Sequence, residues 1–266
     1  RPEAERTPPR CRIVLPPRTG KTVIAGQIIA RTGLVSTFVV PTLALLEQTE
    51  CELGRLMPGV PVGVLNGQVK RPVEHGVNVI TYASLQRQLD QGMLLAPLQA
   101  SALIFVDEAH HAMTDLRQQV LKAAFSPDAI RVALTATPDY DNERRLARHF
   151  PDLIHELELD EALAPGLLAP VRVWIAEVDA NASDVRLLAG DYDIERLGEL
   201  MSDAPFYAAA RAFRYAGDSG AVPAMISCCS RQQARDLWTF LAERRPGGTP
   251  PPALVLGDTP DRKSVV

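Results

Sequence analysis

Short apolar runs rich in valine and isoleucine recur through the first half of the chain, and they restrict the possible folds more than any other feature. Each run is apolar throughout, as expected of a strand that is buried on both faces of a sheet. The segments between the runs have the length and apolar spacing of helices. This alternation predicts an α/β fold in which helices wrap a parallel sheet.

The expected strands are Cys11–Leu15, Ser36–Val40, Val77–Thr81, Ala102–Asp107 and Ile130–Thr135, with a further candidate at Val62–Leu65. The expected helices are Lys21–Arg31, Leu43–Leu56, Tyr82–Leu89, Leu116–Phe125 and Asn142–Phe150.

The alternation loosens after Pro151 and resumes from Ala221. We therefore expect a first domain over residues 1–155, a connecting segment over 156–220 with a strand and helices, and the start of a second α/β domain over 221–266. In this last part the expected strands are Ala224–Cys229 and Ala253–Leu256, on either side of a helix at Arg231–Arg244. Barely two strands do not complete a sheet of the usual size, so the second domain is expected to be incomplete.

Composition is that of an ordinary soluble globular protein, with 266 residues of which 46% are hydrophobic and 23% charged. No signal-peptide layout and no apolar run long enough to cross a membrane is present. The four cysteines, Cys11, Cys51, Cys228 and Cys229, lack metal-ligand spacing, which favours a reducing, cytoplasmic setting. A net charge of -4 excludes a broad positive field, so any nucleic-acid contact has to be local.

The segment Leu15-Pro-Pro-Arg-Thr-Gly-Lys-Thr22 lies between an expected strand and an expected helix. In that layout, loop amides and the helix N-terminus face phosphate oxygens, Lys21 reaches the β and γ phosphates, and the Thr22 hydroxyl binds Mg²⁺. The predicted ATP-binding residues are Pro17, Arg18, Thr19, Gly20, Lys21 and Thr22. The Gly-Lys-Thr triplet by itself also fits a helix N-terminus that merely carries a lysine.

Asp107 and Glu108 come directly after an expected buried strand, at the sheet edge where ligands of α/β proteins bind. Asp107 is suited to hold Mg²⁺ through its water shell, and Glu108 to orient and deprotonate an attacking water. An acidic helix N-terminus stabilised by the helix dipole is the alternative. Adjacent histidines rarely ligate one ion, so we expect His110 to form a hydrogen-bond bridge from the ATP site to the neighbouring domain.

These motifs resemble those of the superfamily-two helicases and translocases, in the branch that carries Asp-Glu-Ala-His. Residues 15–22 resemble motif I, residues 107–110 match motif II, and Thr135-Ala-Thr-Pro138 is similar to motif III, which couples hydrolysis to strand movement in the family. The resemblance implies a RecA-like domain, ATP and Mg²⁺ as cofactors, and Lys21, Asp107 and Glu108 as catalytic residues. It also implies that His110, Thr135 and Thr137 couple the domains.

Two further segments, residues 39–48 and 80–85, resemble the family motifs that grip the nucleic-acid backbone. The resemblance implies Pro41, Thr42 and Thr81 as nucleic-acid contacts, although a helix N-cap explains either threonine equally well. Residues 225–235 resemble motif IV, which opens the second motor domain.

The phosphate loop departs from the family pattern Pro-Thr-Gly-x-Gly-Lys-Thr, because Pro17 and Arg18 replace the threonine and the first glycine. If Arg18 adopts a positive φ, the conformation costs roughly 1 kcal/mol or more. The adenine-reading segment and the motifs that supply an arginine finger are not recognisable, so the chain is expected to be truncated at both ends and to turn over poorly by itself.

The resemblance implies an ATP-dependent helicase or translocase. The double histidine and the Leu-Thr-Ala-Thr-Pro form resemble the restriction-enzyme motors and repair helicases, which favours DNA over RNA and implies nuclease or modification subunits as partners. The alternatives are an RNA helicase, a non-hydrolysing nucleotide-gated nucleic-acid-binding module, and a P-loop enzyme that phosphorylates a small molecule.

Overall fold

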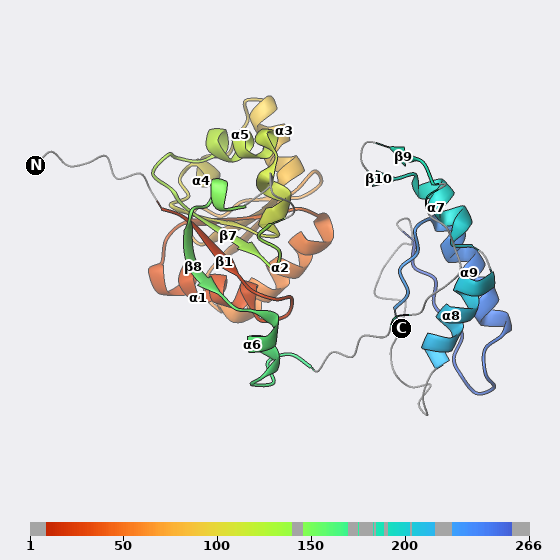
Figure 1. Ribbon diagram of the computed structural model, residues 1–266. Coiled ribbons are helices and arrows are strands. Elements are labelled where there is room, and N and C mark those ends of the chain that lie inside the picture. The colour runs from red at the N-terminus through yellow and green to blue at the C-terminus, as the bar shows by residue number, and fades with distance from the viewer. Residues whose placement is uncertain are drawn as a thin grey trace, which may run out of the picture. The chain divides into compact units, whose positions relative to one another are not determined.

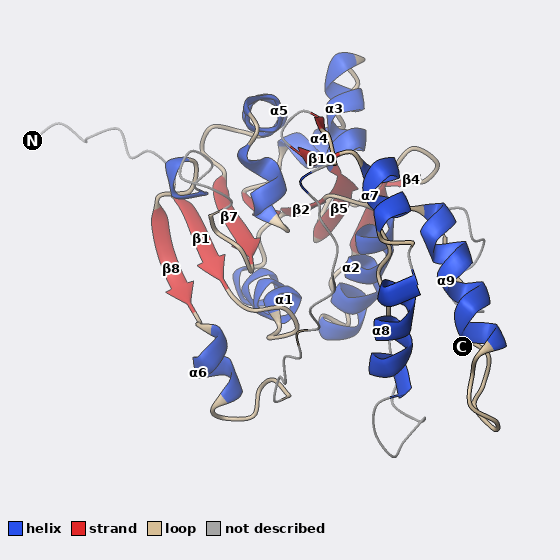
Figure 2. Cartoon of the chain, turned by 45° about the vertical axis from the view of Figure 1, so that its right-hand side comes forward, coloured by secondary structure: helices blue, strands red, loops and turns tan. Residues whose placement is uncertain are grey.

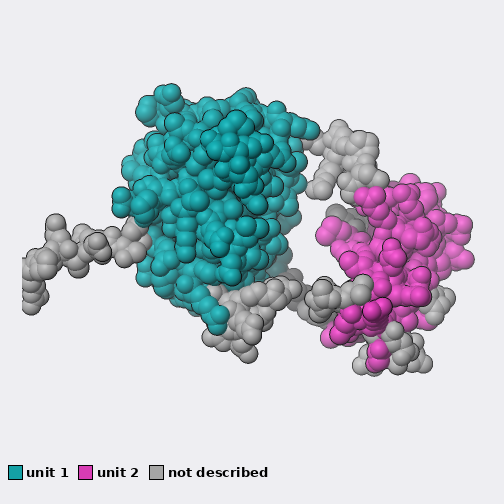
Figure 3. All heavy atoms as spheres, turned by 90° about the horizontal axis from the view of Figure 1, so that it is seen from above, with its two compact units in different colours: residues 1–171 teal, residues 172–266 magenta. Residues whose placement is uncertain are grey.

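The chain folds into two compact units, residues 1–171 and 172–266 (Figure 3). The computed structural model describes residues 9–139, 146–169, 175, 183, 185–188, 191–202, 204–215 and 225–256. The first unit extends past the expected boundary at residue 155, so the expected connecting segment is shared between the two units.

The first unit is built on an eight-stranded sheet with the order β4-β3-β5-β2-β6-β7-β1-β8. Strands β7, β1 and β8 are labelled in Figure 1. Its strands are β1 (Arg10–Val14), β2 (Ser36–Val40), β3 (Val62–Leu65), β4 (Lys70–Arg71), β5 (Val77–Thr81), β6 (Leu103–Val106), β7 (Ile130–Thr135) and β8 (Asp152–Glu156). Every neighbouring pair is parallel except β3 with β4. The expected α/β fold, a parallel sheet flanked by helices, is confirmed.

Helices follow most of the strands of this unit. They are α1 (Lys21–Thr32), α2 (Leu43–Leu56), α3 (Tyr82–Asp90), α4 (Ala96–Gln99), α5 (Asp115–Ala124) and α6 (Leu159–Leu163), with 3-10 turns η1 (Ala109–Met113) and η2 (Leu146–Arg148). Helices α1 and α2 lie on one face of the sheet, and α3, α4 and α5 on the other (Figure 2).

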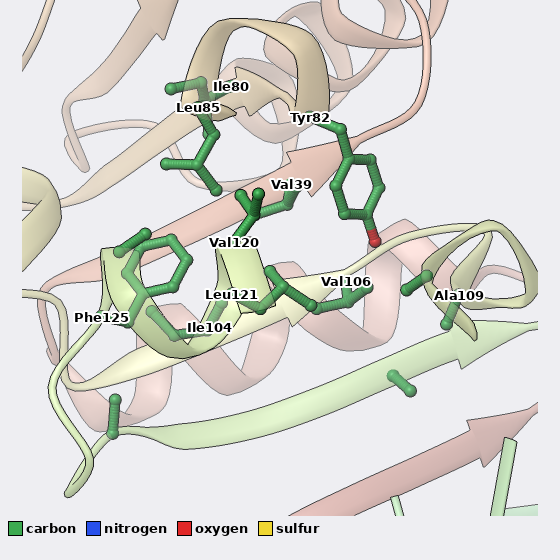
Figure 4. Packing of buried hydrophobic residues seen from close by; sticks show 14 of the residues in the cluster. Val39, Ile80, Tyr82, Leu85, Ile104, Val106, Ala109, Val120, Leu121 and Phe125 are labelled. Atoms are coloured by element: carbon green, nitrogen blue, oxygen red, sulfur yellow. The ribbon is translucent and has the colours of Figure 1, made fainter. Parts of the chain in front are cut away.

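The apolar runs form strands because their side chains alternate between two hydrophobic cores. In β2, Phe38 and Val40 face α1 and α2, whereas Val39 faces α3 and α5. The Phe38 and Phe105 rings stack with centroids 5.5 Å apart in the first core. The second core contains Val39, Ile104 and Leu121 (Figure 4). Burial on both faces explains why these strands lack polar alternation.

Several elements of this unit differ from expectation, and the short β4 and α4 are among those not expected. Strand β8 was not expected, because its residues are polar or exposed and lie at the sheet edge beside β1. The helix expected over Asn142–Phe150 lies partly outside the described residues, and its described part is the short turn η2.

The second unit has a small helical core. It contains the antiparallel strands β9 (Leu187–Leu188) and β10 (Asp191–Tyr192) and the helices α7 (Ile194–Leu200), α8 (Ala204–Tyr215) and α9 (Arg231–Glu243). Tyr207 of α8 packs there against Leu237 and Leu241 of α9.

Contrary to expectation, residues 225–228 and 253–256 do not form strands. In the described part of the chain, these residues form no strand pairing. Hydrogen bonds with α9 hold nearby residues instead. Trp238 Nε1 donates to the Pro252 carbonyl at 2.7 Å, and the Cys229 amide donates to Gln233 Oε1 at 2.7 Å. A second RecA-like domain therefore stays a prediction. None of the helices in the described ranges is both long and apolar enough to cross a membrane.

Candidate functional site

The predicted site residues of the first unit lie at the carboxyl ends of five neighbouring strands. Strands β5, β2, β6, β7 and β1 are consecutive in the sheet, and each is followed by one of the motifs. The phosphate loop follows β1, the acidic pair follows β6, and the Thr135–Pro138 segment leaves the end of β7. The Leu15 amide donates to the Thr135 carbonyl at 2.9 Å, which joins the ends of β1 and β7 directly.

Two residues of the phosphate loop, Gly20 and Arg18, have a positive φ, and for Arg18 this conformation is strained. Gly20 is the N-cap of α1 with φ 94°, and no side chain caps the first turn, so the helix amides remain available to an anion. Arg18 adopts φ 65° at a position where the family pattern has glycine, and this conformation costs about 1 kcal/mol. The Thr19 hydroxyl donates to the Pro16 carbonyl at 2.7 Å, which holds the loop closed.

Lys21 is held at the base of this loop. Its Nζ donates to the Leu15 carbonyl at 3.4 Å, and the side chain is half-buried. The lysine therefore lies at the end of β1, where it also lowers the pKa of Asp107 through its charge. The structure thus places the charge of Lys21 within electrostatic reach of the acidic residue with which it was expected to act.

The acidic pair places a buried carboxyl group beside a second negative charge. Asp107 is 7% exposed. Burial and the adjacent Glu108 charge together raise the pKa of Asp107 to about 6, against the lowering effects of the Glu108 amide and Lys21. Burial beside a second carboxylate favours a compensating cation, and carboxylate oxygens suit Mg²⁺. Mg²⁺ held by Asp107 and Thr22 stays a prediction. No group of three or more metal-binding side chains occurs in the described ranges.

His110 links the acidic pair to the end of β7. Its Nδ1 lies 3.4 Å from Glu108 Oε2, 3.2 Å from Thr135 Oγ1 and 3.3 Å from Thr137 Oγ1. The Thr137 amide donates to Thr135 Oγ1 at 3.1 Å, which closes the network. Every one of these partners belongs to the first unit, so the expected bridge to the neighbouring domain stays a prediction.

His111 lies outside this network. Its ring centroid is 4.3 Å from that of His110. Burial, followed by the charges of His110 and Arg117, lowers the pKa of His111 and favours its neutral form.

Both predicted nucleic-acid threonines are helix N-caps. Thr42, which is exposed, accepts a hydrogen bond from the Leu45 amide at 3.3 Å. Thr81 is 4% exposed, accepts from the Ser84 amide at 3.2 Å and donates to Ser84 Oγ at 2.9 Å. Pro41 is half-buried beside Thr42. The N-cap alternative thus describes the observed bonds, and contact with nucleic acid stays a prediction for these residues.

A contact between α3 and α5 beside the acidic pair was not expected from the sequence. The Arg117 guanidinium lies over the Tyr82 ring, with Cζ 5.1 Å from the centroid. Only the position of Tyr82, immediately after the predicted contact Thr81, pointed toward this region.

A phosphate loop, a buried acidic residue with its acidic neighbour and a threonine segment on adjacent parallel strands define the class of P-loop nucleotide-binding domains with a RecA-like sheet. The family model described as "Type III restriction enzyme, res subunit" matches residues 3–140, which is more than half of the 266 residues. The chain belongs to this family. The expected resemblance to the motors of restriction enzymes and repair helicases is thereby confirmed.

The chain spans less than a third of the length of the curated relatives it matches. The chain is 32% identical over 130 residues to the DNA 3'-5' translocase XPB2 of Sulfurisphaera tokodaii, covering 49% of this chain and 27% of that protein. It is 25% identical over 198 residues to the putative ATP-dependent helicase IRC3 of Saccharomyces cerevisiae, covering 69% and 28%. Among solved structures, the Hef helicase domain of Pyrococcus furiosus aligns with a TM-score of 0.49 at 19% identity, over 89% of this chain and 50% of that one.

Proposed function

We propose that this protein is an ATP-dependent helicase or translocase that acts on DNA. The observation that carries the proposal is the buried Asp107, with Glu108 beside it and the charge of Lys21 within electrostatic reach, at the sheet edge that also presents the phosphate loop. A buried carboxyl group beside a second carboxylate suits a bound cation, and the uncapped amides of α1 supply an anion site at the same sheet edge. Together these features suit a nucleotide triphosphate bound with Mg²⁺.

Each side chain has a role that follows from its place. Lys21 would exchange the Leu15 carbonyl for phosphate oxygens. Thr22 and Asp107 would hold Mg²⁺, which would supply positive charge to the phosphates when bound. Glu108 orients and deprotonates the attacking water. The His110 ring contacts Glu108, Thr135 and Thr137. A movement of the Glu108 carboxylate would therefore be transmitted through His110 to the end of β7.

DNA is favoured over RNA because one relative carries the name DNA translocase and the family description names a restriction enzyme. The same description names a subunit, which supports nuclease or modification subunits as partners. We infer a cytoplasmic location from the free cysteines, Cys11, Cys51, Cys228 and Cys229.

Phosphate release from ATP, measured with duplex DNA, single-stranded DNA and RNA in separate arms, tests the proposal. Lys21→Ala and Glu108→Gln should each abolish nucleic-acid-stimulated release while leaving the fold intact by circular dichroism. The exposed residues Lys122 and Glu74 supply matched controls, since Lys122→Ala and Glu74→Gln change the same charges away from the site. If nucleic-acid-stimulated phosphate release survives Glu108→Gln, Glu108 is not the general base. If RNA stimulates release and DNA does not, the substrate is RNA.

The strained Arg18 and the occupied Lys21 favour one second candidate, a non-hydrolysing nucleotide-gated nucleic-acid-binding module. In such a module, ATP binding opens the Lys21–Leu15 contact and alters nucleic-acid affinity without chemistry. It predicts that a non-hydrolysable ATP analogue changes DNA affinity as much as ATP does, with no phosphate released from the wild-type chain.

A further inference from the structure

Arg117, in the first turn of α5, contacts two segments that approach the catalytic edge from different strands. Its guanidinium lies over the Tyr82 ring, with Cζ 5.1 Å from the centroid, and its Nη1 donates to the His111 carbonyl. The next residue, Gln118, donates from Nε2 to the Ala112 carbonyl at 2.7 Å. Two successive side chains of α5 therefore hold two successive carbonyls of η1.

The turn η1 needs such external support. It is a five-residue 3-10 turn whose N-cap is Glu108, and no side chain caps it. Glu108 has φ 44°, a left-handed conformation that a non-glycine residue keeps only when its surroundings enforce it. Short 3-10 turns are also weak by themselves. The positions of Glu108 and His110 thus depend on the hydrogen bonds that α5 makes to the His111 and Ala112 carbonyls.

Tyr82 gives Arg117 a fixed platform. It is the first residue of α3, directly after Thr81, and it is 5% exposed within the core that includes Ala109 and Ala112. Figure 4 shows its hydroxyl directed toward the segment between Val106 and Ala109. That hydroxyl has no hydrogen-bond partner within the described residues, so the ring, rather than the oxygen, makes the defined contact.

We propose that Arg117 is a positioning residue that ties the Glu108–His110 turn to Tyr82, so that nucleic-acid binding at the segment after β5 adjusts the hydrolytic turn after β6. The link crosses β2, which lies between these two strands in the sheet. This inference rests on the proposed function for its biological consequence. The tether itself is a physical contact that is measurable without hydrolysis.

Hydrogen exchange in the 266-residue chain measures the tether directly. The readout is a peptide that covers residues 108–114, where the His111 amide donates to the Glu108 carbonyl at 2.9 Å. Losing the guanidinium contact and its hydrogen bond should speed exchange in this peptide about tenfold in Arg117→Ala. Peptides from β2 and β6 should be unchanged, and Lys122→Ala, an exposed substitution on the same helix, should behave as wild type. Unchanged exchange in Arg117→Ala would overturn the proposal.

A double-mutant cycle tests whether Tyr82 and Arg117 act as one unit. Tyr82→Leu should speed exchange of the same peptide, and should add nothing in the Arg117→Ala background. Tyr82→Phe keeps the ring and should not speed exchange of this peptide, which separates loss of the platform from loss of folding. Arg117→Lys, which keeps the charge but loses the planar stack, should give an intermediate rate. Fully additive effects would overturn the proposal.

Kinetics then connect the tether with the proposed function. Arg117→Ala should lower the kcat of DNA-stimulated ATP hydrolysis about tenfold and leave KM within about twofold, because Glu108 acts only in the transition state. A general structural defect would instead disturb exchange throughout the sheet. If the wild-type chain shows no stimulated hydrolysis, the proposed function fails while the exchange results still decide the role of Arg117.

Discussion

Replacing Asp107 by asparagine should stabilise the nucleotide-free protein at neutral pH, because the wild-type carboxylate is buried beside a second negative charge. The folded state raises the pKa of Asp107 from 3.8 to about 6. At about 1.36 kcal/mol per pKa unit, that difference corresponds to roughly 3 kcal/mol. Asparagine has nearly the same shape and keeps an oxygen for the Glu108 amide, so most of this free energy should be recovered.

The effect has a defined pH dependence. The folded state holds the Asp107 proton more tightly than the unfolded state, so the wild type loses stability as pH rises from 3.8 to about 6. Asparagine does not titrate. The advantage of Asp107→Asn should therefore be near zero below pH 3.8 and should reach its full size above about pH 6.

Pulsed thiol labelling of Cys11 in increasing urea reports unfolding of the first unit alone, because Cys11 is buried in β1. The free energy of unfolding is compared for wild type and Asp107→Asn at acidic and neutral pH, without Mg²⁺. Asp128→Asn is the control, since Asp128 is exposed and should change stability by less than about 0.5 kcal/mol. Equal stabilisation at both pH values, or none at neutral pH, would refute the electrostatic account of the site.

The same buried carboxyl should make affinity for a Mg²⁺–ATP analogue rise about tenfold per pH unit up to about 6 and then level off, as measured by calorimetry; a flat profile from about pH 5 to 8 would contradict this. Tyr82→Phe should raise the free energy of unfolding by about 1 kcal/mol, because it removes a buried hydroxyl without a partner among the described residues; destabilisation in the Cys11 assay would show that the hydroxyl is bonded. Gly63→Ala should cost about 2–3 kcal/mol in that assay, because its Cβ would lie 2.3 Å from Asn78 Oδ1. Its counterpart Gly54→Ala, where no described atom lies within 4 Å of the added Cβ, should stabilise α2 by about 1 kcal/mol.

The strands of the sheet centre were predictable because burial on both faces leaves a continuous apolar run, as in Phe38–Val40 and Ile104–Val106. The site edge was predictable for a related reason, since motifs that follow parallel strands meet at one edge. Strand β8 was not, because an edge strand with one neighbour has no apolar requirement. Pairing of residues distant in sequence, such as Tyr82 with Arg117, leaves no local pattern at all.

The position of β1 in the sheet has a consequence for how the protein is made. This strand leads into the phosphate loop and precedes the other strands of the sheet in sequence, yet its neighbours are β7 and β8, the last two strands of that sheet. Sheet pairing of such distant segments forms slowly, because a long loop must close first. During synthesis, the loop predicted to hold ATP should therefore leave the ribosome before the rest of this sheet and be among the latest parts of it to acquire a native shape.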